Sequence, residues 1–350
     1  MITCRKGLTV FGVRPKWTYV TRTMPAAAAA AITIGPHDGC AHAGDLIVAK
    51  VEHIGTHDHV EDPHGRRVRL YPGDLVYGAY GNRYATDFYE GYVPDGPRTH
   101  LLTAGGLIGT VAAAHDAHAD PTQLEVAGRL VDNRLRPLSL EDFARPLPPP
   151  SPALSAPITV AVLGTAMSAG KTTTAAAIVR GFARAGFAPG AGKVTGSGSG
   201  KDRWSYQDAG AQALLDFLDF GMPSTFGYPL DRLGATMTAI RDGLAGEGCD
   251  VVVLEIADGL LQEETAWLAQ RLPGFADAVV FAAADALSAR SGVALLHEIG
   301  VTVRAVSGLV TRSPLATREA TAATGLPVLA PAVLADGAAV HLVAREPVLT

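Results

Sequence analysis

Cysteine is scarce in this sequence of 350 residues, and its few cysteines stand far apart. They are Cys4, Cys40 and Cys249. An odd and scattered set does not build the disulfide framework of a small secreted protein. We therefore expect a reducing, cytoplasmic environment.

Long apolar runs and an excess of basic charge are also missing. The longest apolar stretch, residues 25–34, is well short of the roughly 18 residues that cross a membrane. A formal net charge of −5 argues against nucleic acid as the main partner. With 48% hydrophobic and 18% charged residues, the chain is typical of a globular protein. The first 37 residues contain no acid, as in a transit peptide, but their alternating pattern favours a β-hairpin.

Lysine is rare, and its distribution is informative. There are six lysines against twenty-three arginines, yet Lys171, Lys193 and Lys201 each follow a glycine within a short stretch. A lysine ammonium is a compact point charge that enters a crowded phosphate site where the planar guanidinium of arginine does not fit. This choice of lysine indicates a site for a phosphorylated ligand. A plain surface role stays open for Lys193 and, more so, for Lys201.

The strongest motif joins an apolar run to the start of a helix. A strand over 158–163 leads into a small-residue loop and then into Gly170-Lys171-Thr172. Backbone N–H groups and the helix dipole would cradle phosphates, Lys171 would reach the outer ones and Thr172 would offer its hydroxyl to Mg²⁺. Five residues, rather than the usual four, separate Gly164 from Gly170. The predicted nucleotide-binding residues are Gly164, Thr165, Met167, Ser168, Ala169, Gly170, Lys171, Thr172 and Thr173.

The composition divides the chain in two. Residues 1–141 carry short tyrosine-rich strands and predict a small β-rich, barrel-like domain. Residues 142–157 hold six prolines and predict an extended linker. Residues 158–350 alternate strands with helices, which predicts a parallel sheet with helices on both faces. The helices are expected near 170–186, 206–219, 232–246, 261–271, 285–298 and 314–323, and the strands at 158–163, 192–195, 249–255, 278–282, 301–310 and 327–330.

Other candidate site residues follow from strand ends and charge. Glu255 ends an apolar strand and is the first choice for a Mg²⁺ carboxylate, with Asp258 second. Asp208 is expected to open a helix, where an acid is also favoured by the dipole alone. Residues 307–314 either border the nucleotide base or form an ordinary loop. A histidine-rich stretch suggests a metal site or a solvated hairpin; it contains His53, His57, Asp58, His59, Glu61, Asp62 and His64.

Residues 158–350 resemble the dethiobiotin synthetase-like branch of the SIMIBI class of P-loop NTPases. That family carries Gly-Thr-Asp-x-x-x-Gly-Lys-Thr, with the gap seen here. The resemblance implies a second-strand lysine at Lys193, a Mg²⁺-binding acid at Asp208 and a strand-end acid at Glu255. The motif aspartate of the family is Ala166 here, and the barrel-like domain is no part of dethiobiotin synthetase. Because the resembling enzymes often work as dimers, we expect a homodimer or higher homo-oligomer.

Several functions fit these residues. The first is an ATP- and Mg²⁺-dependent kinase acting on a small-molecule substrate, with Lys171, Lys193, Asp208 and Glu255 as catalytic groups and Thr172, Asp208 and Glu255 as metal ligands. The second is a ligase or carboxylase that forms an acyl or carbamoyl phosphate. The third is an acetyl-coenzyme A-dependent N-acyltransferase, in which the cradle holds coenzyme phosphates. The fourth is a nucleotide-gated switch protein.

Overall fold

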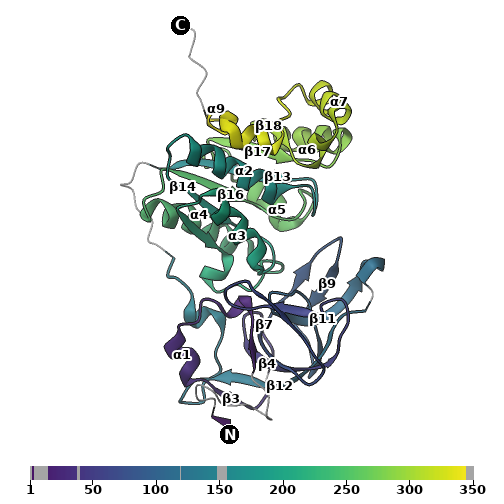
Figure 1. The fold of residues 1–350 in the computed structure, drawn as a ribbon, viewed down its shortest axis with the longest axis vertical. Helices are drawn as coiled ribbons and strands as arrows, with labels where there is room; N and C mark the ends of the chain where they lie inside the picture. The colour runs from purple at the N-terminus through teal and green to yellow at the C-terminus, as the bar shows by residue number, and fades with distance from the viewer. Residues whose placement is uncertain (1, 4–14, 38–39, 119, 148–155, 344–350) are drawn as a thin grey trace. The chain divides into compact units, whose positions relative to one another are not determined.

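The computed structural model describes residues 2–3, 15–37, 40–118, 120–147 and 156–343. Most of the predicted linker (148–155) and much of the predicted N-terminal hairpin (4–14) lie outside these residues. The chain forms two compact units (Figure 1). The first contains residues 1–146, 197–201 and 217–227, and the second contains the remainder. Within the described part of the chain, no helix is long and apolar enough to span a membrane.

The first unit is built around β-strands, and five of them close into a ring. The ring runs β12–β4–β7–β11–β10 and returns to β12. All its pairings are antiparallel except that of β7 with β11. The strands are β1 (Ile2–Thr3), β2 (Lys16–Trp17), β3 (Thr33–Gly35), β4 (Leu46–His53), β5 (His59–Glu61), β6 (Arg67–Arg69), β7 (Leu75–Tyr80), β8 (Arg83–Tyr84), β9 (Tyr89–Tyr92), β10 (Arg98–Leu101), β11 (Leu107–Ala114) and β12 (Gln123–Val131). A closed ring satisfies backbone groups that an open sheet leaves at its edges.

Side chains that point inward at every second position of these strands fill the interior of the ring. In β4, Ile47, Ala49 and Val51 all join one buried cluster, and they are spaced by two residues as a strand requires. Tyr80 and Ile108 pack in the same cluster. The unit also holds helix α1 (Ala26–Ala31) and the 3₁₀ turns η1 (Tyr19–Thr21), η2 (Asp116–His118), η3 (Leu140–Phe143) and η4 (Phe217–Phe220). A small β-rich barrel therefore forms, as the sequence predicts.

The second unit contains a six-stranded parallel sheet in the order β15–β14–β16–β13–β17–β18. The strands are β13 (Ile158–Gly164), β14 (Pro189–Lys193), β15 (Ala213–Asp216), β16 (Val251–Glu255), β17 (Ala278–Ala282) and β18 (Val303–Ser307). The helices are α2 (Lys171–Arg184), α3 (Gly200–Ala209), α4 (Leu230–Gly246), α5 (Glu263–Ala269), α6 (Ala286–Glu298), α7 (Pro314–Thr324), α8 (Pro331–Val333) and α9 (Ala339–His341), with turns η5 (Leu309–Arg312) and η6 (Leu334–Ala338).

Helices cover both faces of this sheet (Figure 1). On one face α2 buries Ala175, Ile178, Val179 and Phe182, whose spacing forms a single helical stripe. On the other face an added methyl group at Gly192 would lie 2.3 Å from Ile240 of α4, so glycine lets helix and strand approach closely. The predicted α/β architecture is thus present.

Two local predictions for this unit are wrong. A helix was expected over 206–219, but α3 ends at Ala209 and β15 follows. Gly210 adopts a left-handed φ of 99°, which ends the helix, and the short apolar run after it pairs with β14. The expected strand at 327–330 is reduced to one bridge between Val306 and Val328.

Two segments that follow β14 and β15 belong to the first unit. They are residues 197–201 and 217–227. The second is held by Asp219, whose carboxylate accepts two hydrogen bonds from the guanidinium of Arg22, at 2.9 and 3.0 Å. Both side chains are only 11% exposed. Removing one partner of such a pair is costly, because the other charge is then left buried without compensation.

We expect Asp219→Asn to lower the free energy of unfolding by about 2–3 kcal/mol, because it leaves the Arg22 guanidinium poorly compensated. Urea unfolding measures the effect. The matched control is Glu52→Gln, which breaks the exposed pair with Lys50 and should change stability by less than about 0.5 kcal/mol. Equal midpoints for the two variants would contradict this role of Asp219.

Candidate functional site: a phosphate loop with two carboxylates and two lysines

The phosphate loop, residues 164–172, joins β13 to α2. Ser168 and Gly170 have left-handed φ values of 59° and 97°, which turn the backbone tightly before α2 begins. The Thr165 N–H donates to the Ala282 carbonyl at 3.0 Å, and the Leu309 N–H donates to the Ala169 carbonyl at 3.0 Å. Strand β17 and the turn η5 therefore hold the loop from outside.

Gly164 has a steric reason for its place at the end of β13. A Cβ atom there would lie 2.8 Å from both the Ala282 carbonyl oxygen and Cγ of Lys171. The Lys171 side chain is 6% exposed, and its ammonium donates to the Ala166 carbonyl at 2.7 Å. The early glycine thus lets the lysine stem lie against the strand end. All the predicted nucleotide-binding residues lie on this loop or in the first turn of α2.

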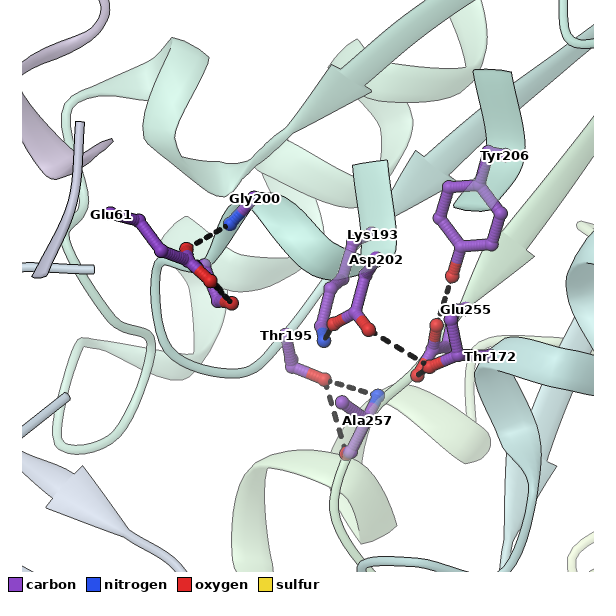
Figure 2. Close-up of polar contacts among 10 residues, drawn as sticks. Glu61, Thr172, Lys193, Thr195, Gly200, Asp202, Tyr206, Glu255 and Ala257 are labelled. Atoms are coloured by element: carbon purple, nitrogen blue, oxygen red, sulfur yellow. Dashed lines mark hydrogen bonds and ion pairs between the residues drawn. The ribbon is translucent and has the colours of Figure 1, made fainter. Parts of the chain in front are cut away.

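Two carboxylates meet the hydroxyl of Thr172. Glu255 ends β16, the strand paired with β13, and its Oε1 lies 3.1 Å from Thr172 Oγ1. Asp202 Oδ1 lies 3.3 Å from the same oxygen (Figure 2). Glu255 is 2% exposed. The structure therefore places Glu255 where the sequence expects it, and it adds Asp202.

Asp208 lies elsewhere on the same helix. It was expected to open a helix, but α3 begins at Gly200, so Asp208 sits in the last turn and is exposed. At 1.5 Å per residue it is about 9 Å further along the axis than Asp202. This expectation is corrected: Asp202, in the first turn, is the acid of α3 that contacts Thr172.

Lys193 ends β14 and faces the same carboxylates. Its ammonium forms an ion pair with Asp202, and both side chains are less than a fifth exposed. Burial acts to lower the pKa of Lys193, but the negative charges of Asp202 and Glu255 outweigh it and the pKa is raised. The lysine therefore carries its charge throughout the physiological range.

Tyr206 completes what we call the Thr172 cluster, formed with Thr172, Lys193, Asp202 and Glu255. Its hydroxyl donates to Oε2 of Glu255, and the side chain is 2% exposed. Burial, reinforced by Glu255 and Asp202, raises its pKa well above the ordinary value, so it remains a donor. The sequence reasoning missed Tyr206 and Asp202. Their i, i+4 spacing is the signal that they share one helical face.

Asp258 follows β16 in a left-handed conformation with φ of 64°. Burial raises its pKa to about 6, although Lys171 and Lys193 act in the opposite direction. At the next residue, Gly259, a Cβ atom would lie 2.6 Å from the Thr165 carbonyl oxygen. The turn after β16 therefore packs directly against the phosphate loop.

The oxygen donors around Thr172 suit Mg²⁺. This ion typically takes one or two carboxylates and fills its remaining positions with water and nucleotide phosphates. One hydroxyl and two carboxylates provide such a set. Over residues 15–343, apart from the undescribed gaps, no group of three or more His, Cys, Asp or Glu residues could hold a metal by itself. The cluster thus suits a cation shared with a phosphorylated ligand.

The histidine-rich stretch has another arrangement. His57 Nε2 lies 3.1 Å from the Leu102 carbonyl oxygen, and its ring stacks on Phe88 with centroids 5.0 Å apart. Burial and then the charge of Arg83 lower the pKa of His57 to about 4. His59 pairs with its neighbour Asp58 at 2.8 Å. β5 and β6 do pair as a hairpin, but His57 is buried among aromatic rings rather than solvated.

Comparisons with known proteins add little. No family model matches the chain, and no curated protein matches it. One similar solved structure is the signal recognition particle 54 kDa protein from Aeropyrum pernix K1 in complex with GDP. It is 17% identical over 54% of this chain and 44% of its own, with a TM-score of 0.38. Another is the signal recognition particle receptor FtsY from Elizabethkingia anophelis, 15% identical over 53% of this chain and 54% of its own, with a TM-score of 0.33.

The chain thus spans about half the length of these proteins. Likenesses this distant carry no weight for function. The class follows from the chain itself. A parallel sheet with helices on both faces, a strand–loop–helix phosphate loop, Lys171 and Thr172 define a P-loop NTPase fold for the second unit.

We expect Tyr206→Phe to raise the Mg²⁺ concentration needed for half-maximal nucleotide binding by about tenfold, because Glu255 loses the donor that orients it. A Mg²⁺ titration with a fluorescent nucleotide measures this. Tyr89→Phe is the control, since it removes a buried tyrosine hydroxyl from the first unit. An unchanged Mg²⁺ requirement in Tyr206→Phe would exclude the orienting role.

Proposed function

We propose that this chain is a Mg²⁺-dependent P-loop enzyme of the SIMIBI type, related to dethiobiotin synthetase, that transfers the γ-phosphoryl group of ATP to a small-molecule acceptor. The observation that supports it most is Lys193. This second lysine lies at the carboxyl end of β14, one strand from Glu255 and paired with an acid that also contacts Thr172. A second cation at that point suits the charge of a transferring phosphoryl group.

Each residue of the site has a role in this proposal. Lys171 would exchange the Ala166 carbonyl for the β- and γ-phosphates, which the backbone N–H groups of the loop also bind. Thr172, Asp202 and Glu255 would hold Mg²⁺, which supplies charge neutralisation for the phosphate oxygens. Lys193 would leave Asp202 for the γ-phosphoryl group and the acceptor. Catalysis would then consist mainly of positioning and electrostatic stabilisation.

The transfer needs a group that accepts a proton. The bond between the γ-phosphorus and its bridging oxygen breaks, a bond to the acceptor oxygen forms, and the acceptor hydroxyl loses its proton. We propose Asp258 as the acceptor of that proton, because its turn packs against the phosphate loop and burial raises its pKa to about 6. Ala166 stands where dethiobiotin synthetase has an acid, and this favours direct transfer over ligation.

Asp202→Asn should raise the Mg²⁺ requirement for nucleotide binding by about tenfold to a hundredfold, because a ligand charge is lost. Asp208→Asn is a matched control on the same helix and should leave the requirement unchanged. Isothermal titration with ATP at varied Mg²⁺ measures both. The reverse order of effects would restore Asp208 as the metal ligand.

The reaction itself is tested by ³¹P spectra of the protein with ATP, Mg²⁺ and sets of hydroxylated or anionic metabolites. A new phosphate ester resonance, absent with Lys171→Ala, is expected. ADP and free phosphate formed only when an acid and an amine are both present would show a ligase instead. Thermal protection by coenzyme A without protection by ATP and Mg²⁺ would indicate the acyltransferase.

A nucleotide-gated switch is the second candidate, and one observation favours it. The segments that follow β14 and β15, residues 197–201 and 217–227, belong to the barrel-containing unit. A change in backbone conformation on nucleotide binding at these strand ends would therefore be passed to the barrel-containing unit along the polypeptide. Tight nucleotide binding with slow hydrolysis and no acceptor, or a preference for GTP, would support this candidate over the kinase.

A further inference from the structure

Glu61 lies on a short hairpin of the first unit. It ends β5, which pairs with β6, and the neighbouring Val60 is fully buried in the barrel core. The Glu61 N–H donates to the Ala104 carbonyl at 2.7 Å. The backbone of Glu61 is therefore fixed to the barrel, and this fixes the position from which its side chain extends.

That carboxylate accepts hydrogen bonds from the start of α3 (Figure 2). The Gly200 N–H donates to Oε2 at 2.7 Å, and the Ser199 hydroxyl lies 3.3 and 3.5 Å from the two carboxylate oxygens. All three residues belong to the first unit. A carboxylate at a helix N-terminus satisfies a backbone donor and interacts favourably with the helix dipole.

This cap comes from an unusual distance along the chain. In α6 and α7 the capping oxygen is supplied by the residue just before the helix, Asp285 and Ser313. For α3 the capping carboxylate stands 139 residues from Gly200 in the sequence. The start of α3 is thus fixed by the barrel as well as by its own sequence.

The next residues of α3 belong to the Thr172 cluster. Asp202, two residues after Gly200, contacts Thr172 and Lys193, and Tyr206 one turn later contacts Glu255. A helix is stiff over so short a distance, so a shift of its first turn moves Asp202 with it. Glu61 and the Thr172 cluster therefore act on the same helical turn.

We propose that Glu61 is a positioning residue for the magnesium–nucleotide site, acting through α3. It touches neither the proposed nucleotide nor the metal, and it sets the place of Asp202. Because coupling between two sites is reciprocal, binding of magnesium and nucleotide would also tighten the Glu61 cap. This gives the barrel unit a role in the second unit's chemistry. The inference rests on the function proposed above.

The test compares Glu61→Gln and Glu61→Ala with the wild type and with Glu125→Gln, which alters an exposed carboxylate of the same unit. The first readout is hydrogen exchange of the α3 amides without nucleotide. The second is the affinity for ATP at varied Mg²⁺. Glu61→Ala should speed exchange in the first turn of α3 and weaken Mg²⁺-dependent ATP binding by about fivefold, roughly the effect of a lost helix cap. Glu61→Gln should act in the same direction but less strongly, and the control should match the wild type.

The outcomes separate this inference from the proposed function. Faster exchange in α3 with unchanged Mg²⁺ and ATP affinity would overturn the positioning role, as would unchanged exchange. If Glu125→Gln weakened ATP binding as much, the cause would be the loss of one negative charge anywhere on the unit, and the positioning role would also be overturned. If the wild type bound no nucleotide at all, the proposed function would fail and the coupling with it, while the exchange data would still report whether Glu61 caps α3.

Discussion

The hydroxyl of Thr172 brings together two carboxylates that stand 30 and 83 residues away in the sequence, and the site depends on this meeting. Two carboxylates around one oxygen, one buried and one largely shielded from solvent, repel each other unless a cation or a donor compensates them. Lys193 supplies the cation and Tyr206 supplies the donor. The arrangement of β14, β16 and α3 can be understood as the means of bringing these five side chains together.

The order of the parallel strands brings these side chains together. β13 lies between β16 and β17, so Gly164 and Glu255 lie at the same end of the sheet, where the strands have their carboxyl ends. α2 begins at the end of the phosphate loop that follows β13, and it carries Thr172 in its first turn. Glycine at 164, 170 and 259 allows backbone and lysine stem to pack where a side chain would clash or strain the chain. Glycine at these three positions is therefore a steric requirement.

The sequence predicts those parts of the site that depend on local pattern. The phosphate loop, the helix after it and the acid at the end of β16 can be identified because strand, loop and helix signals adjoin one another. Asp202 and Tyr206 were missed, because their i, i+4 spacing is informative only once the start of α3 is known. Residues 195–200 look like a flexible loop in isolation, and the cap at Gly200 comes from Glu61. β15 was mistaken for helix because four residues are too few to show a period. The ring of the barrel includes a parallel pairing of β7 with β11. No local sequence pattern predicts which distant strands pair in parallel.

The membership of residues 197–201 and 217–227 in the first unit has a consequence for biosynthesis. Chains that emerge from the ribosome commonly fold one domain at a time, beginning at the N-terminus. Here the first unit lacks part of its packing until residue 227 has been made, including Asp219, the partner of Arg22. By then the phosphate loop has already been synthesised. The barrel unit is therefore completed only after synthesis of the P-loop unit has begun, and a gene fragment that ends at the proline-rich segment would encode an unfinished barrel.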